Sequence, residues 1–255
     1  MPLAYAVVNQ KGGVGKTTTT VNLAAYLATF GKKILLVDID PQSNASVGLG
    51  INRATVVRCL YSVLIEGVPA EEIILKSSIS NLDVLPSTPR LAGAEVELVS
   101  LEPRETRLKQ ALSSVKENYD LIIIDCPPSL SLLTVNALTS ADEVIIPIQC
   151  EYYALEGISQ LTHTLELVRE SLNPELKIRG IILTMYDQRT LLSAQVAEET
   201  RKYFGNKVFK TVIPRNIRLA EAPSFGQPII FYDPGSKGAE AYENLCREVL
   251  DDGQL

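Results

Sequence analysis

Cysteine and histidine are scarce in this sequence, and their scarcity argues against several kinds of site. His163 is the only histidine among the 255 residues, and no Ser-His-Asp arrangement can be argued around it, so packing is its predicted role. The four cysteines are widely separated and form no C-x-x-C pair. This argues against a disulfide framework and a closed zinc site, and it favours the reduced thiols of an intracellular protein.

A leader and long apolar runs are also missing. The first ten residues, MPLAYAVVNQ, have neither the basic start nor the cleavage site of a signal peptide. No apolar run approaches the roughly 20 residues that cross a bilayer. The sequence therefore predicts a cytoplasmic protein with no membrane partner.

Positive charge is in deficit overall but concentrated locally. The chain has 24 Lys and Arg against 30 Asp and Glu, for a net charge of -6, which would repel DNA if it were spread evenly. Residues 201–218, RKYFGNKVFKTVIPRNIR, hold six basic residues and no acidic one. Such asymmetry suits an acidic protein that binds a polyanion through one face. The alternative is an edge strand kept soluble by its lysines.

Six short apolar runs predict buried strands at residues 4–8, 33–38, 82–86, 120–125, 143–148 and 178–184. Most are nearly continuous, which suits strands covered on both faces, and helical patterns such as 20–31 and 154–170 lie between them. The pattern predicts an α/β fold: a doubly wound, mostly parallel sheet with helices on both faces. Because no long linker or repeat is present, we expect one domain over residues 1–255.

The segment NQKGGVGKTT, residues 9–18, lies between the first predicted strand and a helix. Its glycine turn and the start of the helix direct backbone N–H groups at one point, which favours an anion. Lys16 is expected to reach the β- and γ-phosphates of a nucleotide, and Thr17 to ligate Mg²⁺. The segment is therefore predicted to be a phosphate loop.

This loop departs from the usual G-x-x-x-x-G-K-[ST] pattern, because Gln10 stands where glycine is expected and Lys11 adds a second lysine. A lysine in the first half of the loop cannot easily fold back onto phosphates held by its own backbone. It can reach the nucleotide of a neighbouring subunit, whose triphosphate would offset the cost of placing an unpaired lysine in an interface. A solvated loop cation is the alternative.

Three aspartates follow predicted strands. Asp38 and Asp40 end LLVDIDPQ, and Asp125 ends DLIIID. Ligands of doubly wound sheets bind at the carboxyl ends of the strands, so we expect these acids to face one cleft. Asp125 fits a residue that holds a Mg²⁺-bound water, and a strand-end turn is the alternative.

The segment KGGVGKTT resembles the deviant Walker A loop of the ParA/MinD group of P-loop NTPases. Residues 183–196 and 212–229 resemble the C-terminal signatures of ParA/Soj-type partitioning proteins, so the resemblance covers almost the whole chain. It implies a weak, Mg²⁺-dependent ATP hydrolase in which Lys11 crosses a nucleotide-sandwich dimer and Asp40 orients the attacking water, with Asp38 and Asp125 acting on the metal through water. The implied nucleotide-binding residues are Lys11, Gly12, Gly13, Val14, Gly15, Lys16, Thr17, Thr18, Pro214 and Arg215.

The resemblance also implies partners. ATP would favour a homodimer, and the dimer would bind nonspecific double-stranded DNA through Arg189 and Arg218. A ParB/Spo0J-like centromere-binding protein would stimulate hydrolysis, and the protein would be cytoplasmic and associated with the nucleoid. Because the phosphate loop lies so near the N-terminus, no helix-turn-helix domain is expected, and DNA binding should be independent of sequence and sensitive to salt. The chain departs from the family pattern at Ser43 and Leu191, where glycine and asparagine are common.

Three alternatives share the phosphate loop. A MinD-like membrane-cycling ATPase needs a basic amphipathic C-terminal helix, whereas the tail AYENLCREVLDDGQL is acidic. A nitrogenase-iron-protein-like reductase needs two cluster cysteines, but Cys126 and Cys150 do not fall in the motifs of that family. An ATP-dependent small-molecule ligase would be recognised by phosphoryl transfer to a metabolite.

Overall fold

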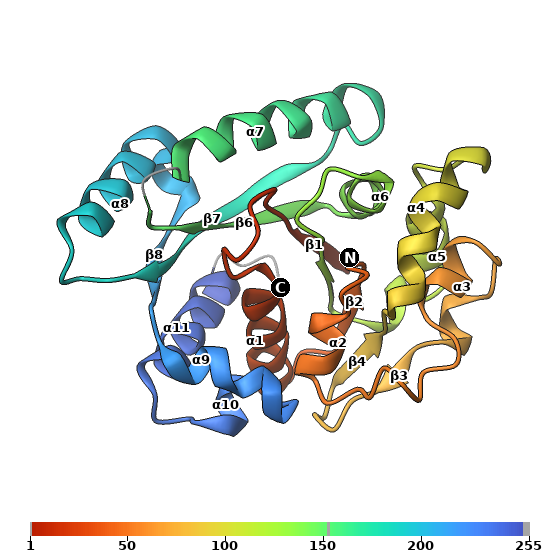
Figure 1. Cartoon of the computed structure of the whole chain (residues 1–255), viewed down its shortest axis with the longest axis horizontal. Coiled ribbons are helices and arrows are strands. Elements are labelled where there is room, and N and C mark those ends of the chain that lie inside the picture. The colour runs from red at the N-terminus through yellow and green to blue at the C-terminus, as the bar shows by residue number, and fades with distance from the viewer. Residues whose placement is uncertain (1, 152–153, 252–255) are drawn as a thin grey trace.

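The computed structural model describes residues 2–151 and 154–251. Residues 1, 152–153 and 252–255 of the predicted domain, including the end of the acidic tail, lie outside the described residues, as do the side chains of residues 154–159. The described strands form one sheet of eight (Figure 1): β1 (Leu3–Val7), β2 (Ile34–Asp38), β3 (Leu75–Lys76), β4 (Leu82–Leu85), β5 (Leu121–Asp125), β6 (Glu143–Gln149), β7 (Lys177–Tyr186) and β8 (Val208–Pro214).

The sheet has the strand order β3-β4-β2-β5-β1-β6-β7-β8. All neighbouring strands run parallel except β3 and β4, which are antiparallel. The predicted doubly wound, mostly parallel sheet is confirmed, and each of the six predicted strands is present. The two-residue strand β3 was not predicted, and β8 lies inside the basic stretch 201–218, where an edge strand was the alternative to a polyanion-binding face.

Helices cover both faces of the sheet, as the sequence predicted (Figure 1). The longer helices are α1 (Lys16–Thr29), α5 (Arg107–Ser113), α6 (Leu132–Ser140), α7 (Ala154–Ser171), α8 (Leu191–Phe204) and α11 (Lys237–Asp251). The short helices are α2 (Asn44–Gly48), α3 (Leu60–Leu64), α4 (Ala94–Glu97), α9 (Ile217–Glu221) and α10 (Ile229–Tyr232). None of the helices among the described residues is both long enough and apolar enough to span a membrane.

The central strands are buried on both faces, and this explains their continuous apolar sequences. Every residue of β5 is buried, and successive side chains enter different cores. Leu121 and Ile123 join a core that also contains residues of α1 and α11, whereas Ile122 and Ile124 join a core with residues of α3, α5 and α6. This alternation follows from the two-residue period of a strand.

The edge strand β8 is held from both sides. On one side it pairs with β7, and on the other the carboxylate of Glu248 in α11 accepts hydrogen bonds from the backbone N–H groups of Lys210 (2.6 Å) and Thr211 (3.0 Å). Phe209 packs over Gly180 of β7, where a Cβ atom would lie 2.4 Å from the ring carbon Cε2. Only glycine leaves room for this ring.

We predict that Gly180→Ala lowers the free energy of unfolding by about 1–3 kcal/mol, because the added methyl group overlaps the Phe209 ring. Urea unfolding followed by circular dichroism would measure the change. Gly235→Ala is the matched control, since its Cβ would meet no atom closer than 3.9 Å. Adding Phe209→Leu to the Gly180→Ala variant should recover part of the loss. Equal stability of the two alanine variants would contradict the packing described here.

Candidate nucleotide site

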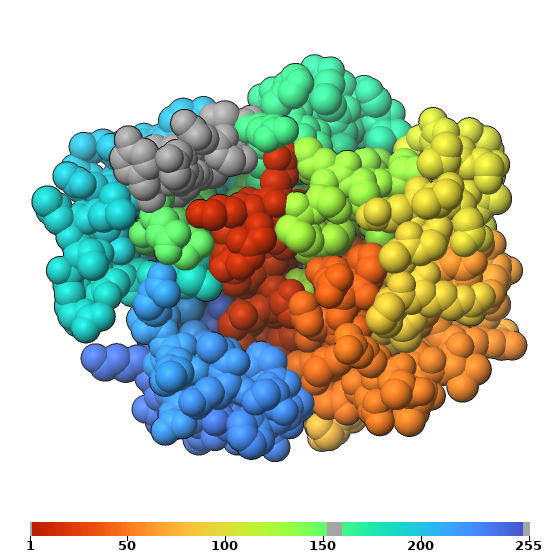
Figure 2. Space-filling view, in the orientation of Figure 1, coloured from red at the N-terminus to blue at the C-terminus, as the bar shows by residue number. Residues whose placement is uncertain are grey.

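The predicted phosphate loop joins β1 to α1 and lies at the centre of the face shown in Figure 2. Gly13 and Gly15 have φ angles of 74° and 89°, a left-handed conformation that glycine adopts without strain. The helix begins at Lys16 and has no side-chain cap. Its first backbone N–H groups are therefore available to an anion, as the sequence predicted.

Lys16 is buried at the start of α1, with 6% of its surface exposed. Its ammonium donates a hydrogen bond to the Lys11 carbonyl oxygen at 3.0 Å. Burial lowers the pKa of Lys16, and the nearby carboxylates of Asp125 and Asp40 partly oppose this effect. A lysine has three N–H donors, so Lys16 retains donors for a phosphate oxygen.

Asp125 is fully buried at the end of β5 and is tied to α1 by two hydroxyl groups. Thr17 donates to Oδ2 at 2.8 Å and Thr20 donates to Oδ1 at 2.9 Å. Burial, followed by the negative charge of Asp38, raises the pKa of Asp125. Sequence reasoning missed Thr20, although its position three residues after Thr17 places both hydroxyl groups on one face of the helix.

Asp38 ends β2, directly opposite Asp125 in the sheet register. Its carboxylate accepts hydrogen bonds from the backbone N–H (2.8 Å) and hydroxyl group (2.7 Å) of Ser46, and from the backbone N–H of Asp40 (3.2 Å). Burial raises the pKa of Asp38 despite these donors. Asp38 therefore fixes the loop that carries Asp40, a function that depends on Ser46, which the sequence did not indicate.

Asp40 reaches the phosphate loop from the end of β2. It lines a cavity of about 310 Å³, together with Gly12, Gly13, Gly15, Lys16, Thr17, Thr18, Gln42, Asn44, Pro128 and Met185. Its Oδ1 accepts a hydrogen bond from the Gln42 N–H at 2.9 Å, and Ser87 donates to its backbone oxygen at 2.7 Å. Of the three acids expected to face one cleft, Asp40 therefore lines this cavity, whereas Asp38 and Asp125 are buried behind it and do not line it.

A second cavity, of about 320 Å³, adjoins the first, and both contact Gly15, Thr18 and Met185. Its walls also include Pro214 and Arg215, with apolar side chains such as Ile213, Leu219 and Tyr242. Such a mostly apolar pocket next to a phosphate loop is suited to a flat heterocyclic base. Met185 has a φ angle of 50°, which is unusual for a residue with a side chain, at a point where both cavities meet.

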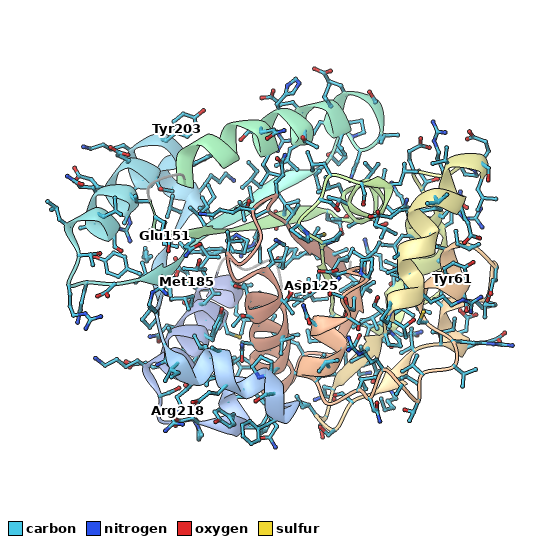
Figure 3. All side chains as sticks on the ribbon, in the orientation of Figure 1. Tyr61, Asp125, Glu151, Met185, Tyr203 and Arg218 are labelled. Atoms are coloured by element: carbon cyan, nitrogen blue, oxygen red, sulfur yellow. The ribbon has the colours of Figure 1, made fainter. Side chains whose placement is uncertain are left out.

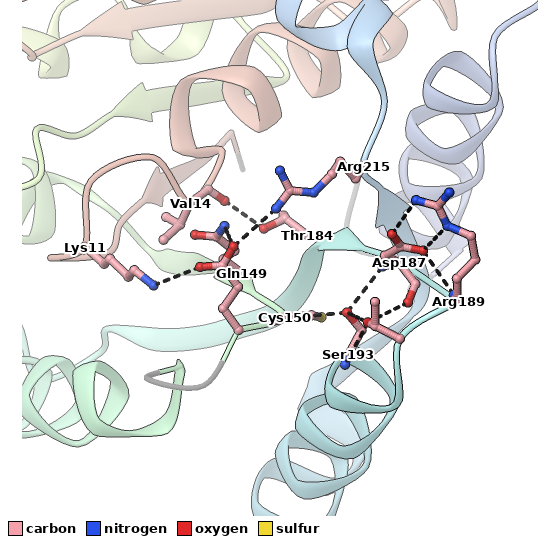
Figure 4. Close-up of polar contacts among 11 residues, drawn as sticks. Lys11, Val14, Gln149, Cys150, Thr184, Asp187, Arg189, Ser193 and Arg215 are labelled. Atoms are coloured by element: carbon pink, nitrogen blue, oxygen red, sulfur yellow. Dashed lines mark hydrogen bonds and ion pairs between the residues drawn. The ribbon is translucent and has the colours of Figure 1, made fainter.

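Lys11 lines neither the phosphate cavity nor the second cavity. Its Nζ lies 3.8 Å from Oε2 of Glu151, whose Oε1 contacts Arg215 at 3.2 Å and accepts a hydrogen bond from Gln149 at 2.5 Å (Figure 4). Figure 3 shows Asp125 near the centre of the view, with Met185 and Glu151 to its left. Glu151 was missed by sequence reasoning, and only its position after a strand could have suggested it.

Arg189 and Arg218 are exposed and lie outside both cavities. The Arg189 guanidinium donates to Asp187 through Nε (2.9 Å) and Nη2 (2.7 Å). Arg218 contacts Glu221 at 2.9 Å and Asp233 at 3.3 Å. Exposed ion pairs contribute only about 0–1 kcal/mol, so another anion can replace these carboxylates. The sequence did not indicate that the two arginines would have acidic partners.

These features define a phosphate-loop nucleotide-binding protein: a glycine turn that opens a helix, a buried lysine, and buried carboxylates at the ends of strands. The AAA domain family matches residues 4–178. The chain belongs to the ParA/Soj family of chromosome-partitioning ATPases. It is 61% identical over 248 residues to the sporulation initiation inhibitor protein Soj of Bacillus subtilis, covering 97% of this chain and 98% of that protein.

A further relative agrees with this assignment, and a solved structure shows a similar fold with a nucleotide bound. The chromosome partitioning protein ParA of Myxococcus xanthus is 56% identical over 244 residues, covering 96% of this chain and 86% of that protein. The crystal structure of cobyrinic acid a,c-diamide synthase from Mycobacterium smegmatis, with a bound ATP analogue and magnesium, is 36% identical. It superposes with a TM-score of 0.85 and covers 97% of this chain and 93% of that one.

We predict that Asp125→Asn makes the stability of the ligand-free protein less dependent on pH. Because the folded-state pKa of Asp125 is raised from 3.8, the unfolded chain loses this proton first as the pH rises. Stability then falls until the pH passes the raised pKa, by at most about 1.4 kcal/mol per pH unit. Urea unfolding between pH 5 and pH 8 should show a smaller decline for Asp125→Asn.

The exposed Asp251→Asn variant is the control for this experiment, because it makes the same chemical change at the surface. It should follow the pH profile of the unsubstituted protein. A decline that is equally steep in Asp125→Asn would show that Asp125 does not retain its proton in the folded chain.

Proposed function

We propose that this protein is a DNA-partitioning ATPase switch. ATP and Mg²⁺ bind each protomer, two protomers form a sandwich dimer, and the dimer binds nonspecific double-stranded DNA. Hydrolysis, stimulated by a ParB-like partner, releases the DNA, and the protein acts in the cytoplasm on the nucleoid. The observation that carries this proposal is the pair of lysines, because Lys16 lines the phosphate cavity whereas Lys11 does not line it and contacts Glu151 instead.

The residues present fit a magnesium nucleotide. The Thr17 hydroxyl retains lone pairs for a metal while it donates to Asp125, and Asp125 would hold a metal-bound water. Thr17 and, through water, Asp38 and Asp125 would hold Mg²⁺, which would supply positive charge to neutralise the phosphates. Lys16 and the loop N–H groups would bind the phosphates, and the cavity beside Pro214 and Arg215 would receive the base.

Asp40 is suited to orient the attacking water. Within the described residues, the hydrogen bonds to its carboxylate engage Oδ1, so Oδ2 can accept a proton from a water in the cavity. The Asp38 carboxylate and the Ser87 hydroxyl fix the backbone on either side of this group. Lys11 would supply positive charge across the dimer, so hydrolysis should depend on dimerisation and remain slow in a single protomer.

Lys11 is available for this contact because its present partner holds it weakly. The Lys11 and Glu151 side chains are 37% and 46% exposed, and at 3.8 Å their ion pair is long. Such pairs contribute about 0–1 kcal/mol. A triphosphate carries more charge than one carboxylate and would compete effectively for the ammonium.

DNA binding is assigned to Arg189 and Arg218, whose acidic partners can be replaced at small cost. Dimerisation would strengthen the interaction, because two linked surfaces bind one polymer with higher avidity than either surface alone. The identity to relatives named for chromosome partitioning exceeds that to the diamide synthase structure, which favours DNA over a small metabolite as the partner.

The alternative of a membrane-cycling ATPase is less well supported. The apolar side of α11 is buried against the rest of the fold through Ala239, Tyr242, Leu245, Cys246 and Val249. An amphipathic helix that binds lipid must expose its apolar side. This packing leaves α11 with little apolar surface for a bilayer.

We expect Lys11→Ala to abolish ATP-dependent dimerisation while leaving ATP binding in place, because only the contact across the dimer is removed. Light scattering with ATP would measure the dimer, and titration calorimetry would measure ATP binding. Lys109→Ala removes another exposed lysine, on α5, and should dimerise normally. An ATP-dependent dimer of Lys11→Ala would rule out the proposed contact.

We also expect Arg189→Glu combined with Arg218→Glu to abolish DNA binding while the ATP dimer persists. Affinity for random-sequence duplex would be measured with ATP in an Asp40→Ala background, which should slow hydrolysis. The control pair, Arg53→Glu with Lys109→Glu, makes the same change in net charge at other exposed positions. If the affinity of the Arg189 and Arg218 double variant stays within about 1 kcal/mol of the unsubstituted protein, the assignment is wrong.

A further inference from the structure

A groove of about 640 Å³ runs between the end of β7, β8 and the first half of α11. Its lining comes from residues 186–189, 211–215 and 237–244. Pro214 and Arg215 separate it from the proposed base cavity, which they also line. Because no residue of the phosphate loop lines it, a nucleotide held by that loop would leave the groove accessible.

Three basic side chains, from three different segments, line this groove: Arg189, Arg215 and Lys237. Two acidic residues, Asp187 and Glu240, line it as well, so the balance of charge is positive. Asp187 is paired with Arg189, and the guanidinium of Arg215 is directed to Glu151 (Figure 4). The groove is therefore polar and open, with cations on opposite walls.

Of the three basic side chains that line the groove, Lys237 is the one without an acidic partner in the described part of the chain. Its side chain is exposed, and it has no ion pair among the residues in the described part of the chain. Across the groove, Arg189 uses only Nε and Nη2 to bind Asp187, whereas a guanidinium has five N–H donors. Each of these two side chains thus retains N–H donors for an anion in the groove.

We propose that this groove binds a phosphodiester of the DNA backbone, with Lys237 and Arg189 as the cations on its two walls. The inference rests on the proposed DNA binding and adds a residue that lies outside the basic stretch 201–218. A lysine ammonium acts as a point charge toward phosphate, so no particular base is required. The site extends the surface of Arg189 across the groove and onto α11.

The test compares Lys237→Glu with the unsubstituted residue, both in the Asp40→Ala background, by titration of random-sequence duplex with ATP at several salt concentrations. We expect affinity to fall about tenfold or more. The slope of log affinity against log salt should also decrease in magnitude by about 0.9 for each DNA phosphate that the variant no longer neutralises. The variant should fold, because glutamate is favourable in the first turn of a helix.

Two matched variants make the test specific. Lys237→Arg keeps the positive charge and should retain affinity, and Lys109→Glu makes the same charge reversal on α5 and should leave DNA binding unchanged. Light scattering should show that all variants form the ATP dimer. Without that check, a failure to dimerise would imitate a weaker interaction with DNA.

Three other outcomes would each contradict the proposed groove site. Unchanged affinity and salt dependence in Lys237→Glu would overturn the groove assignment and leave the proposed function in place. An equal loss in Lys237→Glu and Lys109→Glu would show an effect of net charge and also overturn the assignment. Absence of DNA binding by the protein with Lys237 intact would overturn both the proposed function and the groove.

Discussion

The carboxylate of Asp125 accepts hydrogen bonds from Thr17 and Thr20, and this buried contact joins the central strand β5 to the first turn of α1. Removing a carboxylate from water is costly unless donors compensate for the missing solvation. Two hydroxyl groups and the nearby buried Lys16 offset part of this cost, but burial still raises the pKa of Asp125. The phosphate loop lies between these anchored elements, so its shape depends on the same contact.

A second carboxylate repeats this arrangement beside the first. Asp38 is held by Ser46 and by the backbone N–H of Asp40, so it ties β2 to α2 and sets the position of Asp40. The Asp38 and Asp125 positions are opposite each other in the sheet, and burial raises the pKa of both. A cation brought into this region would relieve their repulsion. The unfavourable proximity of two buried carboxyl groups in the ligand-free site is thus consistent with the magnesium nucleotide that we propose for it.

The basic stretch 201–218 forms the edge strand that its sequence suggested as one of two alternatives. Its middle forms the edge strand β8, whose exposed N–H groups at Lys210 and Thr211 are satisfied by Glu248. Its end carries Arg215 beside the proposed base cavity and Arg218 on α9. Acids distant in the sequence, such as Glu151 and Asp233, neutralise part of the charge. Local composition therefore overstated how much positive charge is available for a polyanion.

The sequence by itself determined the parallel sheet, because fully buried strands require continuous apolar runs, and it determined the phosphate loop, because Gly13 and Gly15 adopt angles that favour glycine. These features depend on residues close together in the chain. Only the tertiary structure decided which distant groups meet. Examples are the contact of Ser46 with Asp38 and the contact of Glu151 with Lys11, which join different segments of the chain. Lys237 and Arg189 likewise line one groove although they are distant in the sequence. Hydrophobic periodicity determines which side of a helix or strand is buried. The register and crossing of these elements determine which polar side chains lie within hydrogen-bonding distance. No local sequence pattern specifies that register or crossing.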